Sequence, residues 1–343
     1  MHRVLITGGA GFIGSNLCRL LVKEDNSSII NLDKLTYAGN RLSVLDLEEL
    51  PNYLFIQGDI GDRLLLKDIF AKHQPTAIMH LAAETHVDRS ISDPAKFIES
   101  NINGTYALLE EARNYFNRLT ASRRDKFRFL AVSTDEVFGE LGRTGYFTET
   151  SPYNPSSPYS ASKASADHLA RAYFRTYGLP TLITNCSNNY GPYQNPEKLI
   201  PLMISHALSG RPLPVYGRGE NVRDWIYVDD HCQALWTVLK HGQIGQAYNI
   251  GARNEKCNLD IVRTICDRLE MIFPAANNPA LQKSSYRDLI TFVQDRPGHD
   301  FRYAIDPSRI CSELGWVAQT DFVSGIDTTI KWYVTHRNWL QNL

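Results

Sequence analysis

Short apolar runs recur along the chain, and the segments between them are long enough to hold helices. The runs are rich in β-branched and aliphatic residues, which is typical of strands buried on both faces of a parallel sheet. We predict strands at 3–7, 28–32, 53–57, 77–82, 129–133, 182–186 and 247–251. Strands that alternate with crossover helices predict an α/β fold with a doubly wound, parallel Rossmann sheet.

Helical patterns occupy several of the connections. Residues 15–23, 94–113 and 159–177 are predicted helices, and the last of them follows a proline-rich stretch that breaks the chain. A fourth pattern, at 225–240, predicts a return of the chain to the sheet domain. The basic, polar segment 122–126 is predicted to be an exposed turn.

The character of the chain changes after residue 186, where a polar, turn-rich segment begins. We expect a smaller lobe that covers the ligand and is interleaved in sequence with the sheet domain. The predicted division assigns 1–186 plus about 224–251 to a dinucleotide-binding domain, and about 187–223 plus 252–343 to a substrate-binding lobe.

A glycine-rich loop joins the first predicted strand to the first helix. Gly8, Gly11 and Gly14 permit a tight turn and a close approach of the main chain to a pyrophosphate at the helix N-terminus. Asp33 ends the second strand, about 20 residues further on, where a carboxylate binds ribose hydroxyls and repels a 2′-phosphate. This arrangement favours NAD over NADP, and a carboxylate that caps the next turn is the alternative.

The ends of the third and fourth strands add candidates for the same cofactor site. Asp59 would accept a hydrogen bond from an adenine amino group, and Ala82 and Ala83 are small enough for a cofactor to lie against them. The other residues assigned to NAD are Phe12, Ile13, Lys34, Thr36, Ile60, Thr85 and Asn188.

The fifth strand ends abruptly in a hydroxyl and two carboxyl groups, Thr134, Asp135 and Glu136. Open α/β sheets bind ligands at the carboxyl ends of their strands, so these residues are candidates for catalysis, and a solvated turn is the alternative. Neighbouring side chains of an ideal strand face opposite ways. Both carboxyl groups therefore reach one substrate only if the backbone turns there.

Tyr159 and Lys163 lie four residues apart on a predicted helix and share a face. Tyrosine, with a pKa of about 10, is a poor base at neutral pH, but a nearby ammonium and a positively charged nicotinamide favour the phenolate. With Thr134 to share the proton, these residues make a site that oxidises an alcohol. The oxidation of an alcohol does not require Asp135 and Glu136. Two carboxyl groups of different protonation state suit an elimination of water.

Composition narrows the classes of partner. The chain has 343 residues and a formal net charge of -1, which argues against a general nucleic-acid or membrane-surface binder. Its six cysteines form no CxxC pair, so we expect no metal site and a reducing, cytoplasmic location. No apolar run is long enough to cross a bilayer, and the N-terminus has no signal-peptide pattern.

The sequence resembles the extended short-chain dehydrogenase/reductase family, in particular its dTDP-glucose 4,6-dehydratases, along essentially the whole chain. The most specific motifs lie at 134–139, 159–163, 188–194, 196–201, 222–225 and 295–300. Similar epimerases and decarboxylases usually lack Asp at position 135. The resemblance implies that Tyr159 and NAD oxidise sugar C4, that Glu136 takes the C5 proton, that Asp135 protonates the departing C6 hydroxyl, and that hydride returns to C6.

The resemblance also implies dTDP-glucose as the substrate and dTDP-4-keto-6-deoxyglucose as the product. The sugar would lie against His86, Thr134 and Asn188. The thymine would meet Glu197, Lys198 and Leu199. The diphosphate and its surroundings would meet Arg223, Asn258, Arg296 and His299. Pro214 and Tyr216 would stack near the base or merely pack, the arginines could be surface ion pairs, and His86 could be structural.

Family members usually form homodimers through a four-helix bundle, which implies helices 94–113 and 159–177 of each subunit here. Two other functions stay open. A nucleotide-sugar 4-epimerase would use Tyr159, Lys163 and NAD and return hydride to C4, although it needs no carboxylate pair. A non-catalytic scaffold would keep the dinucleotide-binding fold without the reaction.

Overall fold

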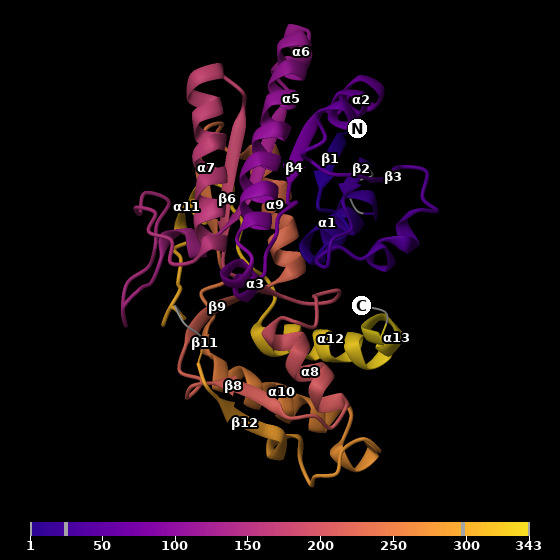
Figure 1. Cartoon of the computed structure of the whole chain (residues 1–343), viewed down its shortest axis with the longest axis vertical. Helices are drawn as coiled ribbons and strands as arrows, with labels where there is room; N and C mark the ends of the chain where they lie inside the picture. Colours follow the sequence, from indigo (N-terminus) through magenta and orange to yellow (C-terminus); the bar gives the residue numbers. More distant parts are fainter. Residues whose placement is uncertain (1, 24–26, 296–298, 342–343) are drawn as a thin grey trace.

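A seven-stranded parallel sheet forms the larger part of the molecule (Figure 1). The computed structural model describes residues 2–23, 27–295 and 299–341. The strand order is β10-β6-β5-β4-β1-β2-β3, and all the pairings are parallel. The strands are β1 (Arg3–Thr7), β2 (Ser28–Asp33), β3 (Tyr53–Gln57), β4 (Ala77–His80), β5 (Arg128–Thr134), β6 (Thr181–Cys186) and β10 (Ala247–Ile250). The predicted doubly wound sheet is confirmed.

Helices cover both faces of this sheet, because alternate strand residues point to opposite sides. Val4 and Ile6 of β1 join one buried apolar cluster, which includes residues of α1 (Phe12–Lys23), α9 (Val228–His241) and α11 (Ser308–Leu314). Leu5, between them, joins the opposite cluster. That cluster is completed by residues of α2 (Arg63–His73), α5 (Thr105–Arg118) and α7 (Pro158–Tyr177).

The position of β1 fixes where a ligand can enter. β1 lies between β2 and β4, so the chain leaves it in both directions across the sheet. A crevice opens at the carboxyl ends of the strands at such a switch point, and ligands of doubly wound folds bind there.

A second apolar core builds the smaller lobe, which lies below the sheet in Figure 1. It contains two small sheets, β11-β9-β7 and β12-β8. Ile310 and Trp316 nevertheless pack in a core of the sheet domain, and the division of the chain into domains stays a prediction. The elements of the lobe are β7 (Asn188–Tyr190), α8 (Leu199–Leu208), β8 (Leu213–Tyr216), β9 (Val222–Tyr227), β11 (Glu255–Cys257), α10 (Asn258–Ile272), β12 (Ile290–Val293), α12 (Phe322–Thr335) and α13 (Arg337–Gln341).

The predicted helix at 94–113 is present, but it is not a regular α-helix. The chain forms a short α4 (Ala95–Phe97), a π-helical segment η3 (Ile98–Gly104) and then α5. In η3, the Asn101 side chain accepts a hydrogen bond from the Glu84 main-chain N–H at 2.8 Å and donates to the Glu84 carbonyl at 3.0 Å. The wider, π-helical turn therefore makes two hydrogen bonds to the segment after β4.

The segment predicted to be an exposed turn, 122–126, is exposed, and its first residues belong to the helical turn α6 (Ala121–Arg124). The Thr120 carbonyl accepts hydrogen bonds from the main-chain N–H groups of Arg123 and Arg124. The remaining short elements are η1 (Arg41–Ser43), η2 (Leu45–Leu47), α3 (Val87–Ser92), η4 (Asp135–Phe138), η5 (Ala275–Asn277) and η6 (Tyr286–Leu289). Within the described ranges, no helix has the length and apolar character needed to span a bilayer.

Candidate active site

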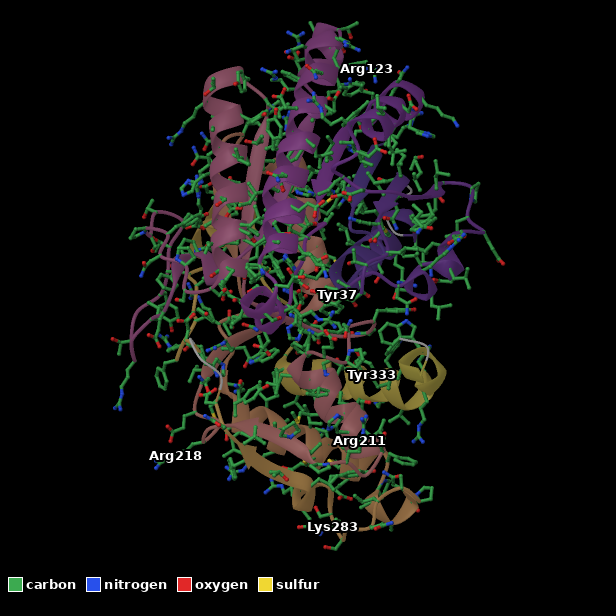
Figure 2. All side chains as sticks on the ribbon, viewed as in Figure 1. Tyr37, Arg123, Arg211, Arg218, Lys283 and Tyr333 are labelled. Carbon is green, nitrogen blue, oxygen red and sulfur yellow. The ribbon has the colours of Figure 1, made fainter. Side chains whose placement is uncertain are left out.

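A cleft runs along the carboxyl ends of the sheet strands, on the side that faces the smaller lobe. Figure 2 labels Tyr37 on the sheet side of this junction and Tyr333 on the lobe side. The Tyr333 hydroxyl donates to the Gln194 carbonyl at 2.6 Å, which ties a segment that lines the cleft to the core of the lobe. Every residue predicted for catalysis or for NAD lines this one cleft, together with Glu197 and Lys198. Their individual roles stay predictions.

The glycine loop brings the start of α1 against the sheet. Gly8 has a φ of +75°, and a Cβ there would lie 2.6 Å from the Ala82 nitrogen, so this position requires glycine. A Cβ at Gly14 would overlap the Gly8 carbonyl oxygen. The Asp33 carboxylate accepts hydrogen bonds from the main-chain N–H groups of Ala10 and Leu35, both at 2.8 Å. The loop is a narrow cradle of main chain that fits a pyrophosphate.

The backbone does turn directly after β5. Thr134 ends the strand and caps η4, since its Oγ1 accepts a hydrogen bond from the Glu136 N–H at 3.3 Å. This turn brings Asp135 and Glu136 into the same cleft, which the sequence alone did not show. Glu136 is partly buried and Asp135 is only 2% exposed. The two carboxyl groups therefore occupy unequal surroundings.

Burial, and next the charge of Glu136, raises the pKa of Asp135 well above its usual range. Its Oδ1 accepts a hydrogen bond from Thr134 at 3.3 Å, while Oδ2 is buried with no hydrogen-bond partner among the described residues. The raised pKa favours the neutral form of the Asp135 carboxyl group, and one of its oxygens is available to a ligand. Such a group is suited to act as an acid.

Tyr159 and Lys163 stand on α7, one helical turn apart, and both are buried. Burial and then the charge of Glu136 raise the pKa of Tyr159 well above its usual range, while a hydrogen bond with Thr134 lowers it. The Lys163 ammonium donates to the Val132 carbonyl at 2.8 Å. The protein's side chains therefore favour the neutral phenol overall, against the expectation that the lysine makes Tyr159 a base.

The opposite rim of the cleft contains the residues predicted to meet the thymine. Glu197 forms an ion pair with Arg89 and lies 3.7 Å from His86 Nε2, and the Lys198 ammonium donates to the Thr85 carbonyl at 3.0 Å. His86 is half-buried, and burial lowers its pKa. These contacts join the segment after β4 to the entrance of the smaller lobe.

Arg223 is buried in the lobe, which excludes the reading of it as an exposed ion pair. Its guanidinium donates to the carbonyls of Val222, Phe301 and Asp300 and lies 4.3 Å from the centre of the Tyr303 ring. The positive charge of Arg223 lowers the pKa of Asp135, against the larger effects of burial and of Glu136. Arg223 therefore lies near enough to Asp135 to act on its pKa, although it does not line the cleft.

The other predicted substrate residues are placed around the lobe. Leu199 begins α8, Asn258 begins α10, and Pro214 and Tyr216 belong to β8. His299 Nδ1 lies 2.7 Å from Asp295, and its ring meets Tyr216 edge to face. Arg296 lies outside the described residues. The residues that do not line the cleft with the catalytic groups are His86, Leu199, Pro214, Tyr216, Arg223, Asn258 and His299.

Sequence reasoning missed several polar residues at this site. The Tyr37 hydroxyl accepts from the main-chain N–H groups of Thr85 and His86, at 3.2 and 3.1 Å, and its ring lies under Arg89. Glu84 lines the cleft. Asp167 is buried one turn after Lys163, and this i+4 spacing was a signal that could have found it.

Known proteins resemble this chain along its length. The family model for GDP-mannose 4,6 dehydratase matches residues 5–329. A dTDP-glucose 4,6-dehydratase of Shigella flexneri is 55% identical over 350 residues, with 99% of this chain and 95% of that protein covered. One of Neisseria meningitidis is 55% identical over 344 residues, with 100% and 96% covered.

Solved structures share the fold of this chain. DesIV, a dTDP-glucose 4,6-dehydratase of Streptomyces venezuelae with NAD and TYD bound, has a TM-score of 0.88 and 42% identity, with 99% of each chain covered. A UDP-glucose 4-epimerase of Thermotoga maritima has a TM-score of 0.83 but only 27% identity, with 97% and 99% covered. The chain therefore belongs to the GDP-mannose 4,6 dehydratase family of extended short-chain dehydrogenase/reductases, in the group of the dTDP-glucose 4,6-dehydratases.

Proposed function

We propose that the protein is an NAD-dependent dTDP-glucose 4,6-dehydratase, which converts dTDP-glucose to dTDP-4-keto-6-deoxyglucose and water. The observation that carries this proposal is the turn η4, which brings Asp135 and Glu136 into the cleft that Tyr159 lines. Full-length relatives with this activity in their names, at 55% identity, support it.

The cleft has the features that NAD needs. The loop from Gly8 to Gly14 would hold the pyrophosphate, Asp33 the ribose hydroxyls of the adenosine, and Lys163 the nicotinamide ribose. NAD, when bound, accepts a hydride from sugar C4 and returns it to C6. Each Asp33 oxygen accepts one main-chain hydrogen bond and keeps a second lone pair for a ribose hydroxyl, whereas an ionised carboxylate here would repel a 2′-phosphate.

Tyr159 takes the proton of the C4 hydroxyl during the oxidation. Its buried surroundings hold the phenol neutral, so positive charge has to favour the phenolate. Lys163 supplies one charge, and the positively charged nicotinamide ring supplies another. Thr134, which hydrogen-bonds with Tyr159, shares the proton.

Glu136 and Asp135 then remove water from the 4-keto sugar. The ketone acidifies the neighbouring C–H, so Glu136 can take the proton from C5 as the C6–O bond breaks. Asp135, whose pKa is raised by burial, gives its proton to the departing hydroxyl. When C6 has received its hydride, the proton on Glu136 returns to C5. Tyr159 releases to solvent the proton that it took from the C4 hydroxyl, and Asp135 takes one proton from solvent, so the protons balance and the cycle is redox-neutral.

The nucleotide end of the substrate would lie toward the smaller lobe. His86 and Asn188 are proposed to line the sugar pocket, and Glu197, Lys198 and Leu199 to meet the thymine. We assign the diphosphate and its surroundings to Arg223, Asn258, Arg296 and His299, with Pro214 and Tyr216 near the base. The location of Glu197 and Lys198 on the rim of the cleft supports this direction for the substrate.

The test is to incubate the protein with dTDP-glucose deuterated at C4 and to locate the label by NMR and mass spectrometry. We expect the label at C6 of a 4-keto-6-deoxy product that has lost one water. Label at C4 of a galactose-configured product would make the protein a 4-epimerase. Absence of any reaction with nucleotide sugars would support a non-catalytic scaffold.

We also propose that the enzyme is a cytoplasmic homodimer. The helices α5 and α7 lie side by side (Figure 1) and leave Tyr106 and Tyr177 exposed at 45% and 47%. An exposed aromatic pair on two adjacent helices supports a bundle with a second copy. The six free thiols fit a reducing compartment. A monomer in light scattering at micromolar concentration would contradict the dimer.

A further inference from the structure

A buried carboxylate lies behind the catalytic pair on α7. Asp167 is 1% exposed, and it follows Lys163 by one helical turn, so both side chains are on the same face of the helix. Its Oδ2 accepts hydrogen bonds from Ser133 Oγ at 2.7 Å, Tyr153 Oη at 2.9 Å and Asn185 Nδ2 at 3.4 Å. Burial raises the pKa of Asp167 above its usual value, while the charge of Lys163 and the hydrogen bonds from Ser133 and Tyr153 act in the opposite direction and favour the ionised carboxylate.

The Lys163 ammonium is buried and needs such an anion. It donates a hydrogen bond to the Val132 carbonyl, which carries no net charge. Burial lowers the pKa of Lys163, and two acidic groups oppose this effect, Asp167 first and then Cys186. Burial raises the pKa of the Cys186 thiol to about 12, so this thiol is neutral at neutral pH. Asp167 is the group left to balance the charge.

The titratable groups on the neighbouring elements do not replace it. His80 on β4 has a pKa lowered to about 3 by burial, so it is neutral. Asp135 and Glu136 on η4 act on the pKa of Tyr159. Arg171, on α7 itself, acts on Asp167 together with Tyr153 from the preceding loop. Among the described residues, Asp167 and Lys163 form no direct ion pair, so the carboxylate acts on the buried lysine through its charge.

We propose that Asp167 is a positioning residue, whose carboxylate is the counter-charge that keeps Lys163 protonated and fixes it beside Tyr159. The inference rests on the proposed function for the role of Lys163. The same network also reaches the catalytic threonine, because Asn185 Nδ2 donates to the Thr134 carbonyl at 3.1 Å and Ser133 directly precedes Thr134. One carboxylate therefore aligns the helix that carries the base and the strand that carries its hydroxyl partner.

A direct test is the titration of Lys163 by NMR in the full-length protein labelled with [ε-¹³C]lysine. The resonance that disappears in Lys163→Arg identifies the residue. We expect Asp167→Asn to lower the pKa of Lys163 by at least about one unit, because an uncompensated ammonium in a buried site loses its proton more easily. Asp167→Glu should keep the value nearer to that of the wild type. If Asp167→Asn does not fold, Asp167→Ser, which also lacks the charge, takes its place.

Asp230→Asn is the matched control. Asp230 is also a buried helical aspartate, and it accepts main-chain hydrogen bonds from Gln319 at 3.1 Å and Thr320 at 2.9 Å, but it does not line the cleft. We expect this variant to lose stability without any change in the Lys163 titration. An unchanged Lys163 pKa in Asp167→Asn as well would overturn the proposal and leave Asp167 a purely structural residue.

The rate of the first oxidation gives a second readout. With dTDP-glucose, the alkaline fall in the rate of NADH formation should move to lower pH in Asp167→Asn, with a loss of roughly tenfold per unit of pKa shift above that pKa. An alkaline limb at its wild-type position would contradict the proposal. If wild-type protein forms no NADH with this substrate, the proposed function fails, while the NMR titration, which needs no substrate, still decides the role of Asp167.

Discussion

Thr134 Oγ1 donates a hydrogen bond to Asp135 Oδ1 at 3.3 Å, at the residue where β5 ends and η4 begins. The same oxygen accepts a hydrogen bond from the Glu136 N–H. One hydroxyl therefore holds the Asp135 carboxyl group and the main chain of Glu136 at the strand end. Because the two groups have different surroundings, single amide substitutions should block different steps of the reaction.

Glu136→Gln should stop the reaction after the first step. Glutamine has nearly the same shape as glutamate but cannot take the C5 proton at neutral pH. We expect NADH to form with substrate, while the exchange of the C5 proton with deuterated solvent is lost. NMR of the sugar in D₂O measures this exchange, and exchange at the wild-type rate would assign the base to another residue.

Asp135→Asn should oxidise the sugar and exchange the C5 proton but eliminate water slowly. General acids typically contribute about 10²-fold to 10⁴-fold, so the yield of the 6-deoxy product per unit time should fall within that range. The wild-type elimination should slow as pH rises through the raised pKa of Asp135, because only the neutral carboxyl donates. Asparagine cannot ionise, so this pH dependence should vanish. If it persists in the variant, the acid is another group.

Tyr159→Phe should instead slow the first hydride transfer, again by about 10²-fold to 10⁴-fold. The substitution removes only the hydroxyl group, which forms a hydrogen bond with Thr134. Stopped-flow absorbance of NADH measures the step before any water is lost. Tyr286→Phe is a suitable control, since it removes a buried hydroxyl that donates to the Phe273 carbonyl in the smaller lobe and does not line the cleft. An unchanged rate in Tyr159→Phe would place the base elsewhere.

Local patterns were sufficient for most of the fold. The strands of the main sheet are short apolar runs, and the helices that pack on them lie next to them in the sequence. Periodicity was therefore enough to identify them. The helix at 159–177 was predictable because prolines set its start. The irregular segment η3 was not, because its shape depends on Asn101, whose hydrogen-bond partner Glu84 lies 17 positions earlier. No local pattern encodes that contact.

The candidate site was predictable to a similar extent. Gly8, Asp33, Tyr159 and Lys163 belong to motifs of fixed spacing, and the cleft brings them together. The raised pKa of Asp135 depends instead on burial, on the charge of Glu136 and on charges from β9, where Arg223 and Asp224 act on it. Asp167 was missed for the same reason, since its hydrogen-bond donors come from β5, the loop before α7, and β6.

Two buried histidines should make the fold sensitive to acid. His80 bridges Thr7 and Thr105, at 2.7 and 2.9 Å, and His231 Nδ1 lies 2.9 Å from Asn189 Oδ1. Burial lowers the pKa of each imidazole from 6.5 to about 3. Between these pH values the unfolded chain binds more protons than the folded protein, so the free energy of unfolding falls as pH drops below 6.5.

Each of these histidines should therefore contribute a slope of about 1.4 kcal/mol per pH unit in the acid range. In His231→Gln, we expect the free energy of unfolding to depend less steeply on pH, by about that amount, between roughly pH 4 and 6. Urea unfolding at a series of pH values measures this difference, and the carboxyl groups common to both proteins cancel in it. Equal slopes in the two proteins would mean that His231 takes up its proton in the folded state as readily as in the unfolded chain.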